Sequence, residues 1–159
     1  MNLFKGLFSS TSPSKECPRC LGKGHVDWDD IKRLKQELKW KPGSCAYCNG
    51  TGKVHPGIEE NVPVDTSYLV TNLPEGERKR ILAGNPEALE RGRSYEDRFD
   101  VFIDQVKFLH LIGKLTPAQI AEFYMIDERN PESYETKKQE LEEYFEKVIK
   151  LKVTRDQME

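Results

Sequence analysis

The 159-residue sequence has no long hydrophobic run. This absence excludes a transmembrane helix, which needs about 20 consecutive apolar residues. Apolar residues are scarce as well, because the hydrophobic set makes up 36% of the chain and charged residues 33%. A small module with so few apolar residues needs a stabilising element besides its hydrophobic core.

Signatures of catalysis are also absent from the sequence. It shows no nucleophile–base pattern, no glycine-rich phosphate loop and no acidic residues at metal-binding spacing. The opening stretch, MNLFKGLFSS, is too short for a signal peptide and carries no cleavage site. We therefore expect a cytoplasmic protein that is not an enzyme.

The net charge of −2 conceals an uneven distribution along the chain. Residues 1–55 carry 10 basic and 5 acidic side chains, a net charge of +5. Residues 56–159 carry 15 basic and 22 acidic side chains, a net charge of −7. Such asymmetry fits a nucleic-acid-binding face, and it equally fits two modules that attract each other.

The four cysteines lie in two copies of one pattern, C-x-x-C-x-G-x-G, at residues 17–24 and 45–52. In a reducing compartment, two close pairs favour metal binding over disulfides. Two thiolates three positions apart can point at one ion, and two such pairs complete the tetrahedron that zinc prefers. The sequence therefore predicts one structural Zn²⁺ without an open coordination position, held by Cys17, Cys20, Cys45 and Cys48.

The glycines of the two motifs fit the same interpretation. They allow the chain to turn sharply after each cysteine pair and to present amide N–H groups to sulfur. These residues are Gly22, Gly24, Gly50 and Gly52. His25 and His55 follow the motifs, and either is an alternative ligand or a neighbour of the metal shell. Thiol–disulfide exchange by the cysteine pairs also stays open, although redox C-x-x-C motifs usually begin a helix.

Between the motifs we predict a helix from about Trp28 to Trp40. Asp27 suits the N-cap position, and the sequence Lys41-Pro42-Gly43 stops the helix. The same helix would place three lysines together on one face, namely Lys32, Lys35 and Lys39.

The rest of the chain is predicted in three parts. Residues 1–14 are predicted to form a flexible N-terminal segment. Whether its Leu and Phe residues dock to a membrane or to a protein stays open. Residues 57–72 form a linker, and residues 73–159 form a helical domain. Several helices of this domain are indicated by a proline at the first helical position. We expect one helix over about 73–84, a second that begins at Pro86 and breaks near Gly92, and a third over about 95–112. A fourth should follow the capping box at Thr116, and a fifth should begin at Pro131.

The doubled motif resembles the cysteine-rich zinc-finger region of DnaJ-type co-chaperones. In that family four such motifs hold two zinc ions. This chain has two motifs, so the resemblance implies that it contains half of that region and binds one zinc ion. It covers only about residues 15–56, and the sequence shows no J domain. The resemblance implies a zinc-stabilised fold and a role in gripping polypeptide.

The predicted fold is therefore mainly α: a small single-zinc DnaJ-type finger with an inserted helix, followed by a C-terminal helical bundle. The predicted function is a non-catalytic adaptor or chaperone-like factor that binds a protein partner or unfolded polypeptide through exposed Leu21, Val26 and Tyr47. A nucleic-acid-binding protein is the alternative, with Lys32, Lys35 and Lys39 contacting phosphates. Aromatic residues interleaved with the lysines, such as Trp28, Trp40 and Tyr47, would then stack on bases. The oligomeric state stays open.

Overall fold

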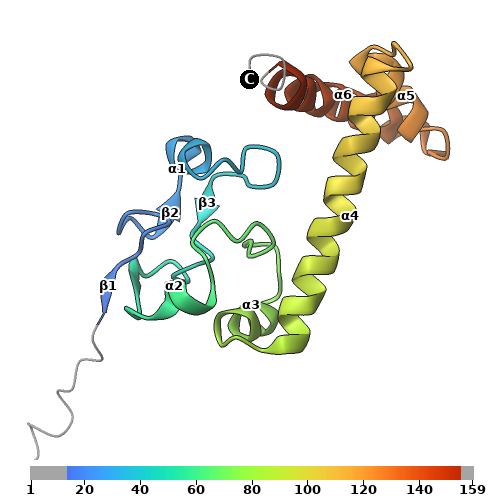
Figure 1. Cartoon of the computed structure of the whole chain (residues 1–159). Helices are drawn as coiled ribbons and strands as arrows, with labels where there is room; N and C mark the ends of the chain where they lie inside the picture. The colour runs from blue at the N-terminus through green and yellow to red at the C-terminus, as the bar shows by residue number, and fades with distance from the viewer. Residues whose placement is uncertain (1–13, 155–159) are drawn as a thin grey trace, which may run out of the picture. The chain divides into compact units, whose positions relative to one another are not determined.

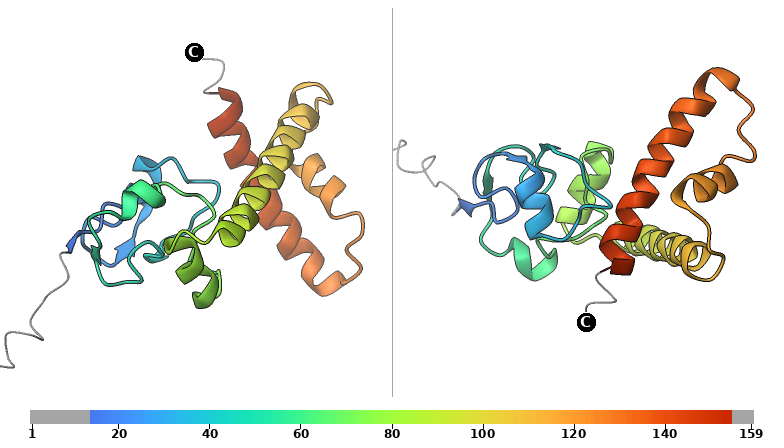
Figure 2. Two further views of the ribbon diagram at one scale, coloured as in Figure 1. Left: turned by 60° about the horizontal axis from the view of Figure 1, so that its bottom comes forward. Right: turned by 90° about the horizontal axis from the view of Figure 1, so that it is seen from above.

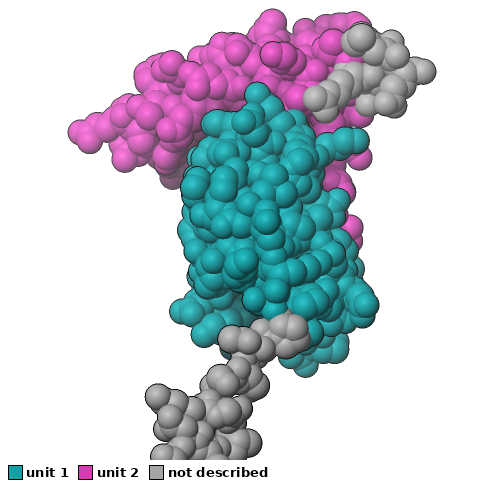
Figure 3. All heavy atoms as spheres, turned by 90° about the vertical axis from the view of Figure 1, so that its left-hand side faces the viewer, with its two compact units in different colours: residues 1–95 teal, residues 96–159 magenta. Residues whose placement is uncertain are grey.

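The computed structural model describes residues 14–154, so the predictions for residues 1–13 lie outside the described residues. Within residues 14–154 the protein is mainly α, as predicted, with four strands of two residues each. The chain divides into two compact units, residues 1–95 and 96–159, which are coloured separately in Figure 3. Among the described residues, no helix has both the length and the apolar character needed to cross a membrane.

The two cysteine motifs are joined by two short antiparallel ladders (Figure 1). Strand β1 (Lys15–Glu16) pairs with β4 (Lys53–Val54), and β2 (His25–Val26) pairs with β3 (Gly43–Ser44). Each ladder pairs a strand that flanks the first motif with a strand that flanks the second, so the ladders hold the two motifs side by side. We call residues 15–56 the cysteine module.

Helix α1 (Trp28–Arg33) begins where the sequence predicts and ends earlier. Asp27 is its N-cap, and a capping box with Asp30 closes the first turn. The predicted continuation to Trp40 is wrong, because Lys35 adopts a positive φ of 58° directly after the helix.

The early end of α1 has a tertiary cause. The side chain of Gln36 donates to the Asp65 carbonyl at 3.2 Å, and Trp40 Nε1 donates to the Ser67 carbonyl at 2.9 Å. These distant contacts determine the path of residues 34–40, which local helix propensity does not control. Because α1 ends at Arg33, the three predicted lysines do not share a helix face.

The segment predicted as a linker, residues 57–72, differs from that expectation. It contains the short helix α2 (Ile58–Asn61), and Val62 and Leu69 are buried in one apolar cluster with the four cysteines. The same cluster continues into Ile81 of α3 (Glu75–Leu82) and Ala88 of the next helix. The core of unit 1 therefore runs from the cysteine module through residues 57–72 to the first helices.

Helix α4 (Pro86–Leu111) is continuous, and the predicted break near Gly92 is wrong. Gly92 is buried, and a Cβ atom at this position would overlap the ring of Tyr68. The glycine therefore lets an aromatic ring lie against the helix backbone. The predicted start of a separate helix at about residue 95 is wrong for the same reason, because that position lies inside α4. The predicted end of α3 at Gly84 and the start of α4 at Asn85-Pro86 are confirmed, since Gly84 has a φ of 77° and Asn85 Oδ1 accepts from the Ala88 amide.

Unit 2 contains the C-terminal part of α4 with α5 (Pro117–Tyr124) and α6 (Pro131–Val148), which continues as the π-helical turn η1 (Ile149–Val153). Helix α5 lies against α6 (Figure 2). The predicted capping box at Thr116 and the start at Asn130-Pro131 are both confirmed. An aromatic cluster forms the centre of this unit, with ring centroids 5.3–6.0 Å apart among Phe102, Tyr124 and Phe145.

Candidate metal centre

The four cysteines of the two motifs converge at one buried point. Their sulfur atoms all lie within 4.8 Å of one another. Two pairs that cross between the motifs, Cys17–Cys45 and Cys20–Cys48, have Sγ–Sγ distances of 3.8 Å. A tetrahedral ion with Zn–S bonds of 2.3 Å requires ligand sulfurs about 3.8 Å apart. The predicted convergence is confirmed, and these two sulfur pairs are spaced as one tetrahedral ion requires.

Backbone amides approach the sulfurs in equivalent ways in the two motifs. The Gly24 amide donates to Cys20 Sγ at 3.3 Å, and the Gly52 amide donates to Cys48 Sγ at 3.2 Å. Such N–H···S hydrogen bonds stabilise the thiolate form that a metal ion binds. In addition, the Cys17 amide donates to the Gly52 carbonyl at 2.8 Å, and the Cys45 amide donates to the Gly24 carbonyl at 3.0 Å. The two motifs are therefore related by an approximate two-fold symmetry.

Glycine is required where the two motifs touch. Gly24 has a φ of 79°, and a Cβ atom there would lie 2.5 Å from the Gly50 carbonyl oxygen. Gly52 has a φ of 76°, and its Cβ atom would overlap the Gly22 carbonyl oxygen. Both the left-handed backbone and the close backbone approach exclude a side chain. The turns that the sequence predicts at the motif glycines are confirmed at these two positions by their positive φ values.

The thiols influence one another electrostatically. A hydrogen bond from Cys45 lowers the pKa of Cys17 to about 5. The same contact raises the pKa of Cys45, and burial raises the pKa of Cys20. The protein groups alone therefore favour ionisation of one thiol at the expense of its neighbours. A divalent cation at the centre would compensate the charge of all four thiolates.

The two histidines next to the motifs do not join the cluster. Among residues 14–154, the group of side chains placed to hold a metal ion consists of the four cysteines. His25 lies exposed on β2, and His55 Nδ1 accepts a hydrogen bond from the Gly57 amide at 3.1 Å. The donor set is therefore all sulfur, which suits zinc better than the oxygen-preferring magnesium or calcium.

Arg19, between the first two cysteines, is a functional residue that the sequence interpretation missed. Its side chain is buried and donates to three backbone carbonyls, those of Val64 at 2.9 Å, Leu69 at 2.7 Å and Thr66 at 3.1 Å. Burial lowers the pKa of Arg19 to about 10, while the nearby Cys45 and Cys17 oppose that shift. The guanidinium is thus a permanent cation beside the thiols. An arginine within a C-x-x-C loop is the sequence signal that could have identified it.

Two aromatic rings pack against the guanidinium of Arg19. Its guanidinium carbon lies 4.1 Å from the ring centroid of Trp40 and 5.2 Å from that of Tyr47, within cation–π range. The Tyr47 hydroxyl donates to the Val62 carbonyl at 2.7 Å. The cysteine module therefore binds the following segment through side chains directed at its backbone carbonyls.

The predicted partner surface is only partly exposed. Leu21 is 53% exposed, whereas Val26 and Tyr47 are 7% and 1% exposed and cannot contact a partner. Both contribute to the core of unit 1, because Val26 packs in the cysteine cluster and Tyr47 fastens residues 57–72. Lys32 and Lys35 are exposed, and Lys39 donates to Ser67 Oγ at 3.4 Å.

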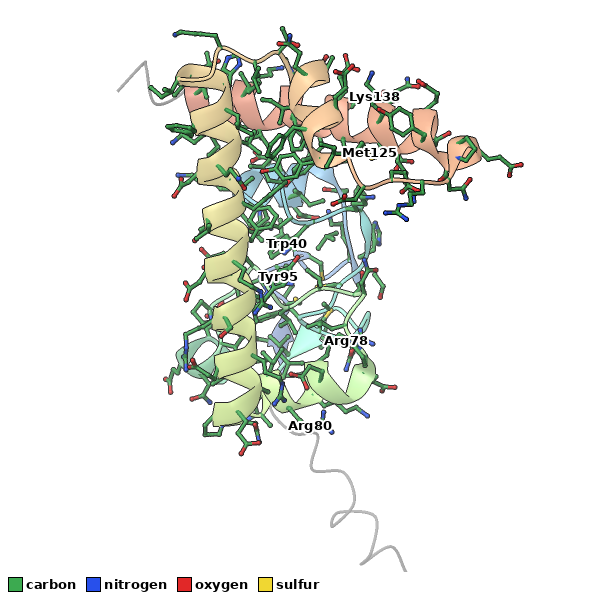
Figure 4. All side chains as sticks on the ribbon, turned by 90° about the vertical axis from the view of Figure 1, so that its right-hand side faces the viewer. Trp40, Arg78, Arg80, Tyr95, Met125 and Lys138 are labelled. Carbon is green, nitrogen blue, oxygen red and sulfur yellow. The ribbon has the colours of Figure 1, made fainter. Side chains whose placement is uncertain are left out.

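A groove of about 980 Å³ lies within unit 1, beside the cysteine module. Its apolar lining comes from the module, from residues 67–74, from α3 and from the N-terminal part of α4, and includes Trp40, Tyr68, Val70, Leu73, Ile81 and Tyr95. Trp40, Tyr95 and Arg80 are labelled in Figure 4. Apart from the buried Arg19, the charged lining residues are Lys39, Lys41, Arg80, Arg91 and one acid, Glu77. We call this feature the unit 1 groove, and its charge is predominantly positive.

In comparisons with protein-family models, with curated proteins and with solved structures, no match to this chain was found.

Proposed function

We propose that this protein is a zinc-stabilised, non-catalytic adaptor that binds a polypeptide segment in the unit 1 groove. The observation that carries the proposal is the convergence of four buried sulfur atoms, two pairs of which lie 3.8 Å apart. Zinc at this centre would bind Cys17, Cys20, Cys45 and Cys48 and supply structural stability. Four thiolates fill the coordination sphere, so no position is left for a substrate.

The unit 1 groove, rather than the surface expected from the sequence, supplies the binding face. Apolar and aromatic side chains give it a floor that a bound segment would desolvate, and interface energy concentrates at such buried apolar contacts. Exposed Lys41 and the arginines of α3 and α4 give it a basic rim, although Arg80 and Arg91 both bind Glu77. The best complement is an extended segment that carries a bulky apolar side chain with acidic neighbours. The resemblance to the DnaJ-type zinc finger supports polypeptide as the ligand class.

Two other functions have less support. Nucleic-acid binding loses two of its three expected stacking residues, because Trp40 and Tyr47 are 5% and 1% exposed. Thiol–disulfide exchange needs an accessible thiolate, and all four cysteines are buried. A reducing compartment such as the cytoplasm suits the proposed thiolate centre.

The test is selection of binding peptides from a random phage-displayed library on the zinc-loaded full chain. We expect enriched sequences to combine a large apolar residue with Asp or Glu. The Lys41→Glu variant, which reverses charge on the rim, should weaken binding of a selected peptide roughly tenfold. The matched control is Lys32→Glu, an exposed lysine of the same module outside the groove lining.

Each outcome of this selection is informative. Failure to enrich any sequence would refute the peptide-binding proposal. Loss of binding in Lys32→Glu but not in Lys41→Glu would move the binding face to the surface around Lys32 on α1. Binding that survives complete removal of zinc would show that the metal centre does not support the groove.

A further inference from the structure

Three charged side chains in the lining of the unit 1 groove form an ion-pair network. The Glu77 carboxylate on α3 accepts from Arg91 Nε at 2.8 Å and from Arg91 Nη2 at 3.0 Å, with one hydrogen bond to each of its oxygens. Arg80 Nη1 donates to the same carboxylate at 3.2 Å. Glu77 is the one acidic residue among the described residues that line the groove. A groove whose charge is predominantly positive thus already holds a carboxylate of its own chain.

The geometry of this network is the one by which arginine recognises a carboxylate ligand. The Nε and Nη2 edge of a guanidinium matches the two oxygens of a carboxylate, and such paired hydrogen bonds are stronger and more specific than single ones. The side chain of Glu77 is only 18% exposed, whereas those of Arg80 and Arg91 are 58% and 54% exposed. Both arginine side chains therefore remain accessible to a molecule in the groove.

The network can be exchanged at small cost. Ion pairs of exposed side chains contribute little to stability, because water solvates the separated charges well. The hydrogen bond from Arg91 lowers the pKa of Glu77, so Glu77 remains charged at neutral pH. An incoming carboxylate would replace one exposed ion pair by another of the same kind, and an apolar group attached to it would gain contacts with the groove in addition.

Aromatic side chains beside the arginines indicate what accompanies that carboxylate. Tyr95 lies one helical turn after Arg91 on α4, lines the groove and is 50% exposed. The ring of Tyr68 lies against Gly92, which directly follows Arg91. A carboxylate next to a bulky apolar group would contact the arginines and the rings together.

We propose that Arg80 and Arg91 form the carboxylate-binding subsite of the unit 1 groove, and that Glu77 occupies this subsite until the ligand displaces it. The inference rests on the proposed function, because it identifies the groups that bind the acidic part of the polypeptide. Glu77 then sets the specificity of the groove. A neutral segment leaves the ion-pair network intact, whereas an acidic segment competes with Glu77 for the two arginines.

Titration of the zinc-loaded full chain with phenylacetate tests the subsite, with the arginine Nε–H signals in NMR spectra as the readout. Glu77→Gln removes the competing charge at nearly unchanged side-chain size, so this variant should bind phenylacetate roughly fivefold more tightly than the wild type, with a shift of the Arg91 signal. The matched control is Glu75→Gln, which removes the same charge from α3 at a residue that pairs with Lys79 outside the groove lining. Phenylacetamide, which has no charge, should not distinguish the three proteins. Equal phenylacetate affinity in all three proteins, or no binding to Glu77→Gln, would overturn the proposal.

A second pair of variants separates ligand binding from a structural role, because the network also links α3 to α4. In the Glu77→Gln background, Arg91→Lys keeps the positive charge but loses the two-bonded edge, so phenylacetate affinity should fall roughly fivefold or more. The control is Arg93→Lys, because Arg93 is an exposed arginine of α4 that pairs with Glu90 outside the groove lining. Urea unfolding of each variant reports stability. If Glu77→Gln lowers the urea midpoint and weakens phenylacetate binding, the network is structural and the proposal is wrong.

Synthetic copies of a peptide selected on the wild-type protein connect the subsite to the proposed function. A copy with Asn and Gln in place of Asp and Glu, and a copy with an amidated C-terminus, show whether the carboxylate belongs to a side chain or to the end of the peptide. The copy that lacks this carboxylate should lose the gain in affinity that Glu77→Gln gives. Selected peptides that bind the wild type and Glu77→Gln equally would refute the subsite and leave the proposed function standing. A library that enriches nothing, together with tighter phenylacetate binding by Glu77→Gln, would refute polypeptide as the ligand and support the subsite.

Discussion

The substitution Gly24→Ala should destabilise the cysteine module by two separate effects. The backbone of Gly24 has a φ of 79°, a left-handed conformation that costs a residue with a Cβ atom about 1–2 kcal/mol. The new Cβ atom would also lie 2.5 Å from the Gly50 carbonyl oxygen, a backbone atom that cannot swing aside. Overpacking of this kind costs about 1–3 kcal/mol. We expect a loss of about 2–5 kcal/mol in the free energy of unfolding from these two contributions.

Two other glycines separate these effects. At Gly84 the φ is 77° but a Cβ atom meets nothing within 4 Å, so Gly84→Ala reports backbone strain alone. At Gly43 a Cβ atom also meets nothing within 4 Å and the φ is not positive, so Gly43→Ala should change stability by less than about 0.5 kcal/mol. The expected order of destabilisation is Gly24→Ala, then Gly84→Ala, then Gly43→Ala.

The assay is urea unfolding at a fixed free zinc concentration, followed by circular dichroism and by zinc release to a coloured chelator. Because zinc binding is coupled to folding of the module, Gly24→Ala should also weaken apparent zinc affinity by roughly 30-fold or more. If Gly24→Ala and Gly84→Ala unfold at the same urea concentration, the close approach of the two motifs does not contribute to stability. The reasoning from the two-fold arrangement would then be refuted.

Three further predictions concern the same module. Chelation of zinc, or the double change Cys45→Ser and Cys48→Ser, should remove roughly 10–16 kcal/mol of apparent binding free energy and unfold the module, and an unchanged circular dichroism spectrum would contradict this. Arg19→Met leaves three carbonyls without their donor and should lower the urea midpoint by the equivalent of about 3 kcal/mol or more. Burial raises the pKa of Tyr47 from 10.0 to about 12, so the unfolded state ionises first. The contribution of Tyr47 to the free energy of unfolding is then fully present below pH 10 and falls by about 2–3 kcal/mol as the pH rises to 12. The Tyr47→Phe variant should lack this part of the alkaline loss of stability, which unfolding measured over the same pH range would show.

The features predicted correctly from the sequence are those that depend on neighbouring residues. The spacing within each C-x-x-C pair lets two thiols point at one ion, and the repeat of the motif indicates that both pairs share it. Helix starts are equally local, since the hydroxyl of Thr116 reaches an amide three residues away. Asp27 caps α1 for the same reason. The centre and the helix starts could therefore be found without knowledge of the fold.

The wrong predictions arise from contacts between residues far apart in the sequence. Gly92 looks like a helix breaker until the ring of Tyr68, 24 positions earlier, is found against it. Trp40 looks like the last residue of an amphipathic helix, but its indole donates to the Ser67 carbonyl at 2.9 Å. Local propensities are too weak to oppose such tertiary contacts, and one sequence does not reveal which distant residues meet.

Arg19 connects the metal centre to the unit 1 groove. It stands between two of the cysteines, and its guanidinium holds the carbonyls of residues 64, 66 and 69. Residues 67–74 form one wall of the groove, and Arg19 itself contributes to the lining. A metal ion that orders the Cys17–Cys20 loop would therefore also order the groove wall. By thermodynamic linkage, a polypeptide bound in the groove would raise the affinity of the centre for its metal by the same factor.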